Sequence, residues 1–317
     1  MSPYINHTMP VRKKKLIHQA ERKVPEFKEL LHRLQRSLSV LGRSQATFNA
    51  YSRHIAAMAL HFGKIPTKVT PDEVHDYLFL LQNRSVTPSQ TYFKHTVYSL
   101  RFLLKSEGIS YEYLKLPVIK HEKKLQVILS KQEVWSMLHH CKLLKHRILI
   151  GLLYGCGLRC LEVRNIRIQD LDFDRKLLRV VQSKGKKDRY VPLSKHLIRG
   201  LKKYLAQEKP IDWIFNGQPY GYQLRAGGDF DGRYSQKGVQ WVIKQASAKA
   251  GIQKNVHTHT LRHSYATHLL EDGMDIVTLK NLLGHSDLKT TLIYLQSAQI
   301  NPKKVKSPLD SLFKKFG

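Results

Sequence analysis

The stretch from residue 257 to residue 296 constrains the fold most strongly, because it joins helical spacing to two sharp interruptions. It reads HTHTLRHSYATHLLEDGMDIVTLKNLLGHSDLKTTLIYLQ, and Gly273 and Gly284 break it into three predicted helices. Side chains that bind anions or transfer protons recur along these helices: His259, Arg262, His285 and Tyr294. The stretch therefore predicts a mainly α-helical domain that carries a cluster of chemically active side chains.

The segment upstream predicts the rest of this domain, which we place at residues 130–300. Ser130 and Glu133 have the spacing of a capping box, and the apolar helix KHRILIGLLYGCGLR that follows ends at Gly155. Two further helices read KHLIRGLKKYLAQ and GVQWVIKQASAKAGI. Between them, residues 213–236 are rich in Gly, Tyr and Asn and show no period, so we expect a loop there.

A small antiparallel sheet is predicted inside the same domain. LDFDRKLLRVVQS and RYVPL read as strands, with GKKD as a turn. Lys184 lies near the tip of this hairpin, and Lys186 and Lys187 beside it are candidate contacts to a nucleic-acid backbone. The domain is therefore expected to be of mixed α+β type.

The first third of the chain predicts a helical domain over residues 21–113. VPEFKELLHRLQRSLSVLG has apolar residues at helical spacing, Ser44 is a candidate N-cap, and Thr70-Pro71-Asp72-Glu73 is a helix start. The last of four expected helices carries the candidate DNA-binding residues Lys94, Arg101 and Lys105.

Three basic segments flank the two domains. Residues 1–20 are expected to be a flexible arm, and residues 114–129, with Lys123 and Lys124, a linker that runs along nucleic acid. Residues 301–317 predict a C-terminal tail helix whose short apolar stripe is either core or a contact to a neighbouring subunit.

The charge of the chain points to a polyanionic partner. The net charge is +30, and residues 1–120 carry 19 Lys and Arg against 8 Asp and Glu, so the excess is shared by both domains. Such a charge predicts strong, salt-dependent binding of nucleic acid. No apolar run long enough for a bilayer and no secretory signal are recognisable, so we expect a cytoplasmic, nucleoid-associated protein without a membrane partner.

Neither a disulfide framework nor a metal site is expected. The three cysteines have no C-x-x-C spacing, which favours buried, reduced thiols. His257, His259, His263 and His268 crowd one segment, but no Cys, Asp or Glu lies nearby at ligand spacing. We therefore expect no cofactor and no metal, and cleavage that is insensitive to EDTA would test the latter.

The residue types fit phosphoryl transfer from DNA to a protein hydroxyl. Guanidinium groups bind the non-bridging oxygens of a phosphodiester and stay charged, so Arg159 and Arg262 are the candidate pair. Tyr294 is the candidate nucleophile and His259 its proton acceptor. His285 is expected to donate a hydrogen bond to a phosphate oxygen, and Lys184 to protonate the leaving deoxyribose oxygen.

The order of these motifs resembles the tyrosine recombinase, or phage integrase, family. The matching elements are GLRCLE, KGKKDR, HTLRHSYATHL, LLGHSDLKTT and IY, and the likeness runs from about residue 25 to the end. It implies a SAM-like core-binding domain followed by a catalytic domain. It also implies the catalytic set Arg159, Lys184, His259, Arg262, His285 and Tyr294, with Glu162 supporting the first arginine.

The resemblance implies a reaction and an assembly. The tyrosine would cleave one strand to a 3′-phosphotyrosine, and two rounds of strand exchange would pass through a Holliday junction. Paired sites on double-stranded DNA would hold a homotetramer, formed from free monomers or dimers, with possible accessory DNA-bending proteins.

The biological branch stays open at this point. The compact build resembles Xer-type recombinases, whereas VKSPLD near the end and the added segment 213–236 resemble integron and mobile-element integrases. Two rival functions also remain: a type IB topoisomerase-like enzyme, and a basic architectural protein without catalysis. Replacing Tyr294 with Phe would spare binding in either case and abolish cleavage only in an enzyme.

Overall fold

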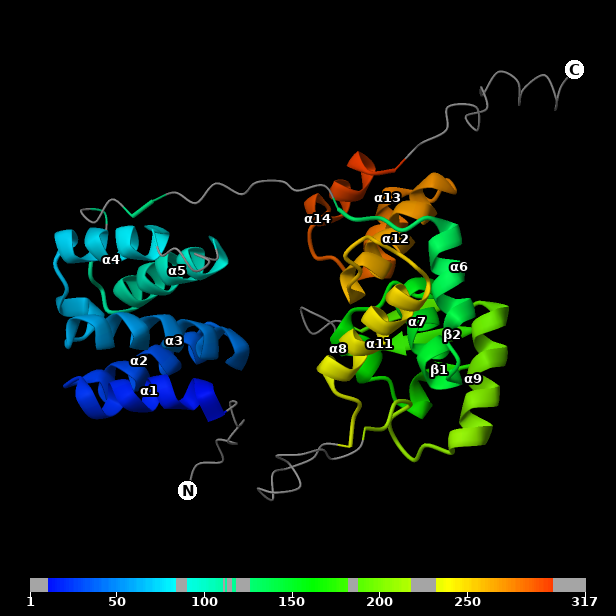
Figure 1. Cartoon of the computed structure of the whole chain (residues 1–317), viewed down its shortest axis with the longest axis horizontal. Coiled ribbons are helices and arrows are strands. Elements are labelled where there is room, and N and C mark those ends of the chain that lie inside the picture. Colours follow the sequence, from blue (N-terminus) through cyan, green and yellow to red (C-terminus); the bar gives the residue numbers. More distant parts are fainter. Residues whose placement is uncertain are drawn as a thin grey trace, which may run out of the picture. The chain divides into compact units, whose positions relative to one another are not determined.

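The computed structural model describes residues 11–83, 90–110, 112, 116–117, 126–181, 188–217 and 232–298. The chain divides into two compact units, residues 1–122 and 123–317 (Figure 1). The division falls within the segment 114–129 that the sequence marks as a linker. None of the described helices has both the length and the apolar composition that a bilayer crossing requires.

The first unit is a bundle of helices. Its described elements are α1 (Val11–Lys23), α2 (Phe27–Val40), α3 (Gln45–Phe62), the 3-10 turn η1 (Pro66–Lys68), α4 (Pro71–Asn83) and α5 (Gln90–Ser106). Phe27, Leu30, Leu34 and Leu38 form one buried stripe on α2, at the spacing that predicted this helix. The stripe packs in one core with residues of α1, α3 and α5.

The helix starts predicted in this unit are confirmed. The Ser44 hydroxyl accepts a hydrogen bond from the Thr47 amide at 3.3 Å and caps α3. At the start of α4, the Thr70 amide donates to the Glu73 carboxylate at 2.7 Å, and the Glu73 amide donates to the Thr70 hydroxyl at 3.3 Å. This reciprocal pair is the capping box that the sequence predicts.

The expectation of a flexible arm over residues 1–20 is wrong for residues 11–20, which belong to α1. Ile17 and Ala20 are buried in the same core as α2, and α1 packs against α3. In the sequence, the run of basic residues from Arg12 is typical of a solvent-exposed tail, and the apolar positions of the helix begin only a few residues later. Helix α1 is thus added to the four predicted helices, while residues 1–10 lie outside the described part of the chain.

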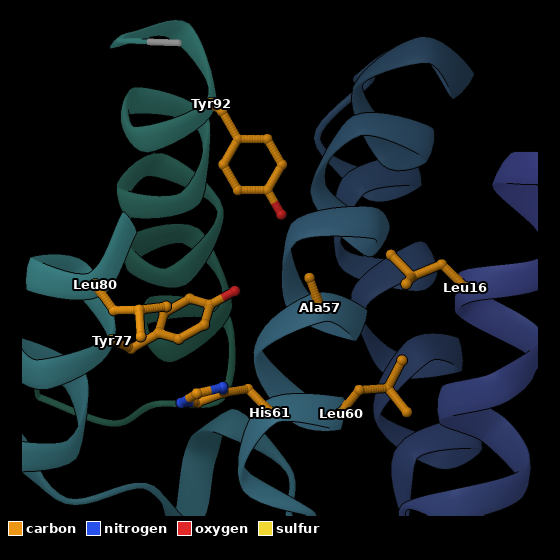
Figure 2. Close-up of a pocket in the computed structure, with 7 residues that line it drawn as sticks. All are labelled: Leu16, Ala57, Leu60, His61, Tyr77, Leu80 and Tyr92. Atoms are coloured by element: carbon orange, nitrogen blue, oxygen red, sulfur yellow. The ribbon is translucent and has the colours of Figure 1, made fainter. Parts of the chain in front are cut away.

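A cavity of about 360 Å³ opens in this unit between α1, α3, α4 and α5. It is lined by Leu16, Ala57, Leu60, His61, Tyr77, Leu80 and Tyr92. Figure 2 shows the rings of Tyr77 and Tyr92 reaching from α4 and α5 toward α3. Its lining contains one histidine and two tyrosines but no carboxylate or guanidinium.

The second unit contains a small sheet surrounded by helices. Its described elements are α6 (Lys131–His140), α7 (Leu144–Gly155), α8 (Cys160–Arg164), η3 (Ile168–Asp170), β1 (Leu171–Asp172), β2 (Leu177–Val180), β3 (Arg189–Pro192), α9 (Lys195–Glu208), α11 (Gln236–Lys249), α12 (Thr258–Glu271), α13 (Ile276–Leu283), α14 (Lys289–Leu292) and η4 (Ile293–Gln296). The strands are antiparallel in the order β1-β2-β3. A mainly helical fold with a small antiparallel sheet is therefore confirmed.

Helix α12 is the structural centre of this unit. It contacts α7, α11, α13 and η4, and most of its residues are buried (Figure 1). The Ser264 hydroxyl accepts a hydrogen bond from the Leu129 amide at 2.9 Å, which ties α12 to the chain just before α6. A helix enclosed in this way places its polar side chains against fixed neighbours, and several of the predicted site residues lie on it.

Two other predictions about this unit can be checked directly. The Ser130–Glu133 capping box is present at the start of α6, with both reciprocal hydrogen bonds. The cysteines are free thiols: Cys141 and Cys156 are buried, and Cys160 is half-buried. Burial raises the pKa of Cys156 to about 12, which makes this thiol unreactive.

Candidate active site

A single buried carboxylate organises the polar cluster of the second unit. Glu162, in the first turn of α8, is 7 % exposed. Arg159 donates to it from its amide and from Nη1, each at 2.8 Å. Arg189 forms a bidentate pair with it, Nη1 to Oε1 at 3.0 Å and Nη2 to Oε2 at 2.9 Å. Burial alone raises the pKa of this carboxyl, but hydrogen bonding and charge from Arg189, with further help from Arg159, hold it at about 2.

Arg189 is a member of the cluster that we did not predict. Its side chain is 8 % exposed, and its Nε donates to the Leu282 carbonyl at 2.7 Å. Each of its guanidinium nitrogens thus has a partner within the protein. The sequence does hold a signal: alternation along β3 puts Arg189 on the same face as the buried Val191, and an arginine in that position needs a buried partner.

Arg262 lies almost entirely inside the unit, at 2 % exposure. Its Nη1 donates to the Gly157 carbonyl and its Nη2 to the Leu283 carbonyl, both at 2.6 Å. The second acceptor lies at the C-terminus of α13, where the helix dipole favours a cation. Burial, followed by the charge of Arg159, lowers the pKa of Arg262 to about 10, so the group stays positively charged at neutral pH.

Arg159 is more open than its two partners. Its side chain is 20 % exposed, against 3 % for Arg262. Besides Glu162, its guanidinium contacts only the Gly284 carbonyl among the described hydrogen bonds, at 3.4 Å. It is therefore the arginine of this cluster best placed to bind an incoming anion.

Tyr294 is held inside the same cluster. It lies on η4, is 2 % exposed and packs with Leu279 and Leu283 of α13. Its hydroxyl lies 3.2 Å from Nδ1 of His263 on α12. Burial raises the pKa of Tyr294, and the charges of Arg262 and Arg159 oppose that rise. The phenol is consequently protonated at neutral pH and must lose its proton to act as a nucleophile.

His285 has partners on both sides of its ring. Nε2 lies 3.0 Å from Nη2 of Arg262, and Nδ1 lies 3.0 Å from the Thr291 hydroxyl. Because a guanidinium only donates, Nε2 accepts, and Nδ1 carries the proton and donates to Thr291. Burial, then the charges of Arg262 and Arg159, lower the pKa of His285 to about 4. Its expected hydrogen bond to a phosphate would require a change in this arrangement.

His259 does not contact Tyr294. It lies exposed in the first turn of α12, and its ring stacks on that of His263 with the centroids 6.2 Å apart. The H-x-x-R spacing suggested that His259 and Arg262 point the same way, yet Arg262 turns into the interior. The histidine that touches the candidate nucleophile is His263, which the sequence analysis considered only as a metal ligand.

Comparison with known proteins decides the family. Residues 127–300 match the model of the phage integrase family. The chain is 33% identical over 306 residues to the putative integrase/recombinase y4qK of Sinorhizobium fredii, covering 94% of this chain and 93% of that protein. It is 34% identical over 268 residues to a tyrosine recombinase of Thermosipho africanus, covering 80% and 90%. The chain is a tyrosine recombinase of the phage integrase family.

Solved structures show the same fold at low sequence identity. The XerH site-specific recombinase, in a post-cleavage complex with its difH substrate, matches with a TM-score of 0.62 and 18% identity over 96% of this chain and 94% of that chain. The Tn1549 transposon integrase, in complex with circular intermediate DNA, matches with a TM-score of 0.63 and 16% identity over 91% and 99%. These structures extend the likeness to the fold, whereas the matches in sequence confirm the recombinase family inferred from the motifs and, with it, the enzyme class.

Several predicted site residues of the recombinase fall outside the described part of the chain. These are Lys184, Lys186 and Lys187 in the β2–β3 connection, and Lys123 and Lys124 in the predicted linker. On α5, Lys94 is half-buried and Lys105 exposed. Arg101 has a different contact from the one expected: its Nη2 donates to the Leu116 and Pro117 carbonyls at 2.9 and 3.0 Å, which fastens the chain beyond α5.

The histidine-rich segment of the recombinase does not form a metal cluster. Among the described residues, no group of three or more His, Cys, Asp or Glu side chains is placed to hold a metal ion. His268 instead contacts the Tyr154 hydroxyl through Nδ1 at 2.9 Å, and His263 contacts Tyr294. His263 and His268 are thus each within hydrogen-bond distance of a tyrosine hydroxyl.

A polar hollow of about 350 Å³ lies on the other face of the sheet. Arg179 of β2 lines this hollow. Between β2 and β3, Arg179 lies opposite Tyr190, and the next residue, Val180, lies opposite Arg189. Neighbouring residues of a strand point to opposite faces, so this hollow and the Glu162 cluster are separated by the sheet. Asp170 accepts hydrogen bonds from Arg179 at 3.2 Å, which partly neutralises the hollow.

Proposed function

We propose that this recombinase cuts and rejoins DNA strands with Tyr294 as the nucleophile, and that it integrates and excises a mobile element or exchanges integron-type cassettes. The observation that carries the chemistry is that the buried Tyr294 hydroxyl lies 3.2 Å from a histidine nitrogen and experiences the charges of the Arg262 and Arg159 guanidinium groups. A tyrosine in an apolar cluster is normally structural. This one has a histidine nitrogen 3.2 Å from its oxygen and the charges of Arg262 and Arg159 acting on it.

Each group has a role in the proposed reaction. Arg159 binds a non-bridging phosphate oxygen through its exposed guanidinium surface. Arg262, held by two main-chain carbonyls, provides a fixed positive charge for the oxygens that gain charge in the transition state. Lys184 protonates the leaving 5′ oxygen. Glu162 and Arg189 position this set and do not touch the phosphate.

The proposed reaction conserves the phosphodiester bond. The tyrosyl oxygen forms a bond to phosphorus, the bond to the 5′ oxygen breaks, and a 3′-phosphotyrosine remains. A free 5′ hydroxyl from the partner duplex then attacks that linkage and releases Tyr294. Two such rounds exchange both strand pairs through a Holliday junction.

Double-stranded DNA with paired recombination sites is the proposed substrate. The charge of +30 supports this, because an excess shared by both units suits a protein that contacts a duplex over a long distance. Of the proteins that share the fold, XerH is described bound to its difH substrate and the Tn1549 integrase in complex with circular intermediate DNA. We further propose four protomers on two sites and a backbone-contact role for Lys94 and Lys105.

Xer-type resolution of chromosome or plasmid dimers is the second candidate role. It is supported by 33% identity over 267 residues to the tyrosine recombinase XerA of Pyrococcus horikoshii, covering 84% of this chain and 88% of that protein. The integrase role is supported by the greater coverage of the relative named integrase/recombinase. The two roles differ in where the sites lie: at the ends of a mobile element, or once on the chromosome or plasmid.

Covalent trapping in EDTA tests the proposal. The wild-type protein and Tyr294→Phe are mixed with fragmented genomic DNA of the encoding cell, denatured, and the protein-linked DNA is sequenced. The proposal predicts adducts only with wild type, at a shared two-fold-related sequence whose position distinguishes the two roles. Tight DNA binding by both proteins without any adduct would contradict it.

A further inference from the structure

The proton of the candidate nucleophile has an acceptor that the predicted catalytic set does not contain. Nδ1 of His263 lies 3.2 Å from the Tyr294 hydroxyl, and the two ring centroids are 5.5 Å apart. His259, the expected acceptor, stacks behind His263 and has no described contact with Tyr294. A general base must lie within hydrogen-bond reach of the proton that it removes.

Resting on the proposed function, we propose that His263, rather than His259, takes the proton of Tyr294 during strand cleavage. The geometry supports this because His263 and Tyr294 are both held by packing. His263 lies on α12, and the residues immediately before and after it in the sequence are buried. Tyr294 packs in an apolar cluster with residues of α13. Neither ring needs to move for the transfer to occur.

The protonation state of His263 fits the role of an acceptor. The titratable groups that face it are His259 and Arg262 on its own helix and Tyr294 on η4. Burial, followed by His259 and Arg262, lowers its pKa to about 4, so the ring is neutral at physiological pH. A neutral ring with an unprotonated Nδ1 accepts the phenolic O–H. A phosphodiester bound beside Arg159 and Arg262 adds a negative charge, which raises the pKa of His263 when the proton must be transferred.

The proposed step balances as follows. The phenolic proton moves to Nδ1 of His263 as the tyrosyl oxygen forms its bond to phosphorus. The bond from phosphorus to the 5′ oxygen breaks, and that oxygen receives a proton from Lys184. In religation, the imidazolium of His263 returns its proton to the departing Tyr294 oxygen.

His259 then has a different role. Exposed in the first turn of α12, it is placed to meet DNA rather than the enclosed hydroxyl. The two histidines lie one turn apart on the helix and thus have separate roles. His263 accepts the proton of the nucleophile, and His259 contacts the DNA substrate.

The same helix offers a matched control. Nδ1 of His268 contacts the Tyr154 hydroxyl at 2.9 Å, an equivalent histidine–tyrosine pair. Tyr154 lies on α7 and belongs to none of the groups that we place around the phosphate. Changing His268 removes a comparable hydrogen bond and should not change the rate of cleavage in correctly folded protein.

The experiment measures single-turnover adduct formation on a nicked duplex that carries the sequence recovered by covalent trapping. A sulfur atom replaces the bridging 5′ oxygen at the scissile phosphate, so the leaving group needs no proton from Lys184. The proteins are wild type, His263→Ala, His259→Ala and His268→Ala, each with and without added imidazole. Thermal unfolding and binding of the same duplex identify any variant that is misfolded.

We expect His263→Ala to lose about 10²-fold or more in rate, the usual contribution of a general base. Imidazole should restore part of that loss, increasing with the concentration of its neutral form. His268→Ala should cleave like wild type, and imidazole should not accelerate His259→Ala.

A second variant separates proton transfer from positioning. His263→Asn keeps a hydrogen-bonding group near Nδ1 but cannot take up a proton. If it cleaves like wild type, His263 only positions Tyr294 and the inference is wrong. Undiminished cleavage by His263→Ala, or rescue by imidazole of His259→Ala alone, would also overturn it. Absence of adducts from wild type would instead refute the proposed function, and the inference with it.

Discussion

Removing the charge of Glu162 while keeping its shape tests the central electrostatic claim. The Glu162 side chain is 5 % exposed and has a pKa of about 2, against an ordinary value of 4.5. That difference corresponds to about 3 kcal/mol of stability at neutral pH, since one pKa unit is worth about 1.4 kcal/mol. Glu162→Gln also leaves Arg159, Arg189 and Arg262 without the anion between them. We therefore expect a loss of about 3–5 kcal/mol, the range for breaking a buried ion pair.

The pH dependence of this loss has a definite sign. The folded pKa of Glu162 lies below the unfolded one, so its contribution is complete above about pH 5 and is lost as the pH falls toward 2. The difference between wild type and Glu162→Gln should accordingly be constant from pH 5 to 8 and shrink below pH 4.5. The neutral variant itself lacks this titration.

Urea unfolding followed by tryptophan fluorescence measures the loss of stability in the second unit, which contains Glu162. Trp135, Trp213 and Trp241 are the only tryptophans, and all lie in residues 123–317. A loss of 3 kcal/mol lowers the urea midpoint by about 1 M or more. Glu133→Gln is the control, because glutamine also completes a capping box and the pairing of Glu133 with Lys254 is partly exposed. If Glu162→Gln unfolds at the wild-type midpoint, or if the difference does not depend on pH, the reasoning is wrong.

Two further predictions concern the groups around this carboxylate. Arg189→Lys keeps the charge and can keep one hydrogen bond to Glu162, but it loses the second bond of the bidentate pair and the bond to Leu282. We therefore expect urea unfolding to show a loss of about 3 kcal/mol, at about 1.5 kcal/mol for each of the two lost charged hydrogen bonds. Arg179 pairs with Asp170 at a more exposed position. An equal loss of stability in Arg179→Lys would show that burial does not increase the cost of breaking the Arg189 pair. Gly157→Ala should cost about 2–4 kcal/mol in the same assay, because Gly157 has φ +60 and an added methyl would overlap a neighbouring ring. Gly155→Ala, which meets open space at the end of α7, should unfold like wild type or slightly later.

The sequence predicted best what depends on local chemistry. The capping boxes at Thr70 and Ser130 are confirmed, because each is fixed by residues three positions apart. The helix breaks at Gly273 and Gly284 are confirmed as well, since both glycines adopt positive φ. The first helix was missed because basic residues dominate its start, and its described core residues, Ile17 and Ala20, come after that basic run.

The contacts within the site depended on tertiary structure and could not be predicted in the same way. Spacing along a helix placed His259 beside Arg262, but packing turned Arg262 toward the carbonyls of Gly157 and Leu283. Those acceptors are 105 and 21 residues away in sequence, and no local pattern relates them to the arginine. The partner of Tyr294 was likewise decided by where η4 meets α12, which placed it against His263.

The charges of the cluster explain why one carboxylate is surrounded by three arginines. Arg159 and Arg189 pair with Glu162, and Arg262 lies 3.8 Å from it. His263 and His285 are neutral at physiological pH, since the pKa of each is about 4. Three positive charges and one negative charge leave a site with two positive charges in excess.

A phosphodiester brings one negative charge, and the transition state at phosphorus carries more negative charge on its oxygens. A site with this excess stabilises the transition state more than the bound substrate, which is the condition for catalysis. In the proposed reaction, Glu162 holds the arginines in place and offsets one of their three positive charges, and the remaining two would match the negative charge that develops during cleavage.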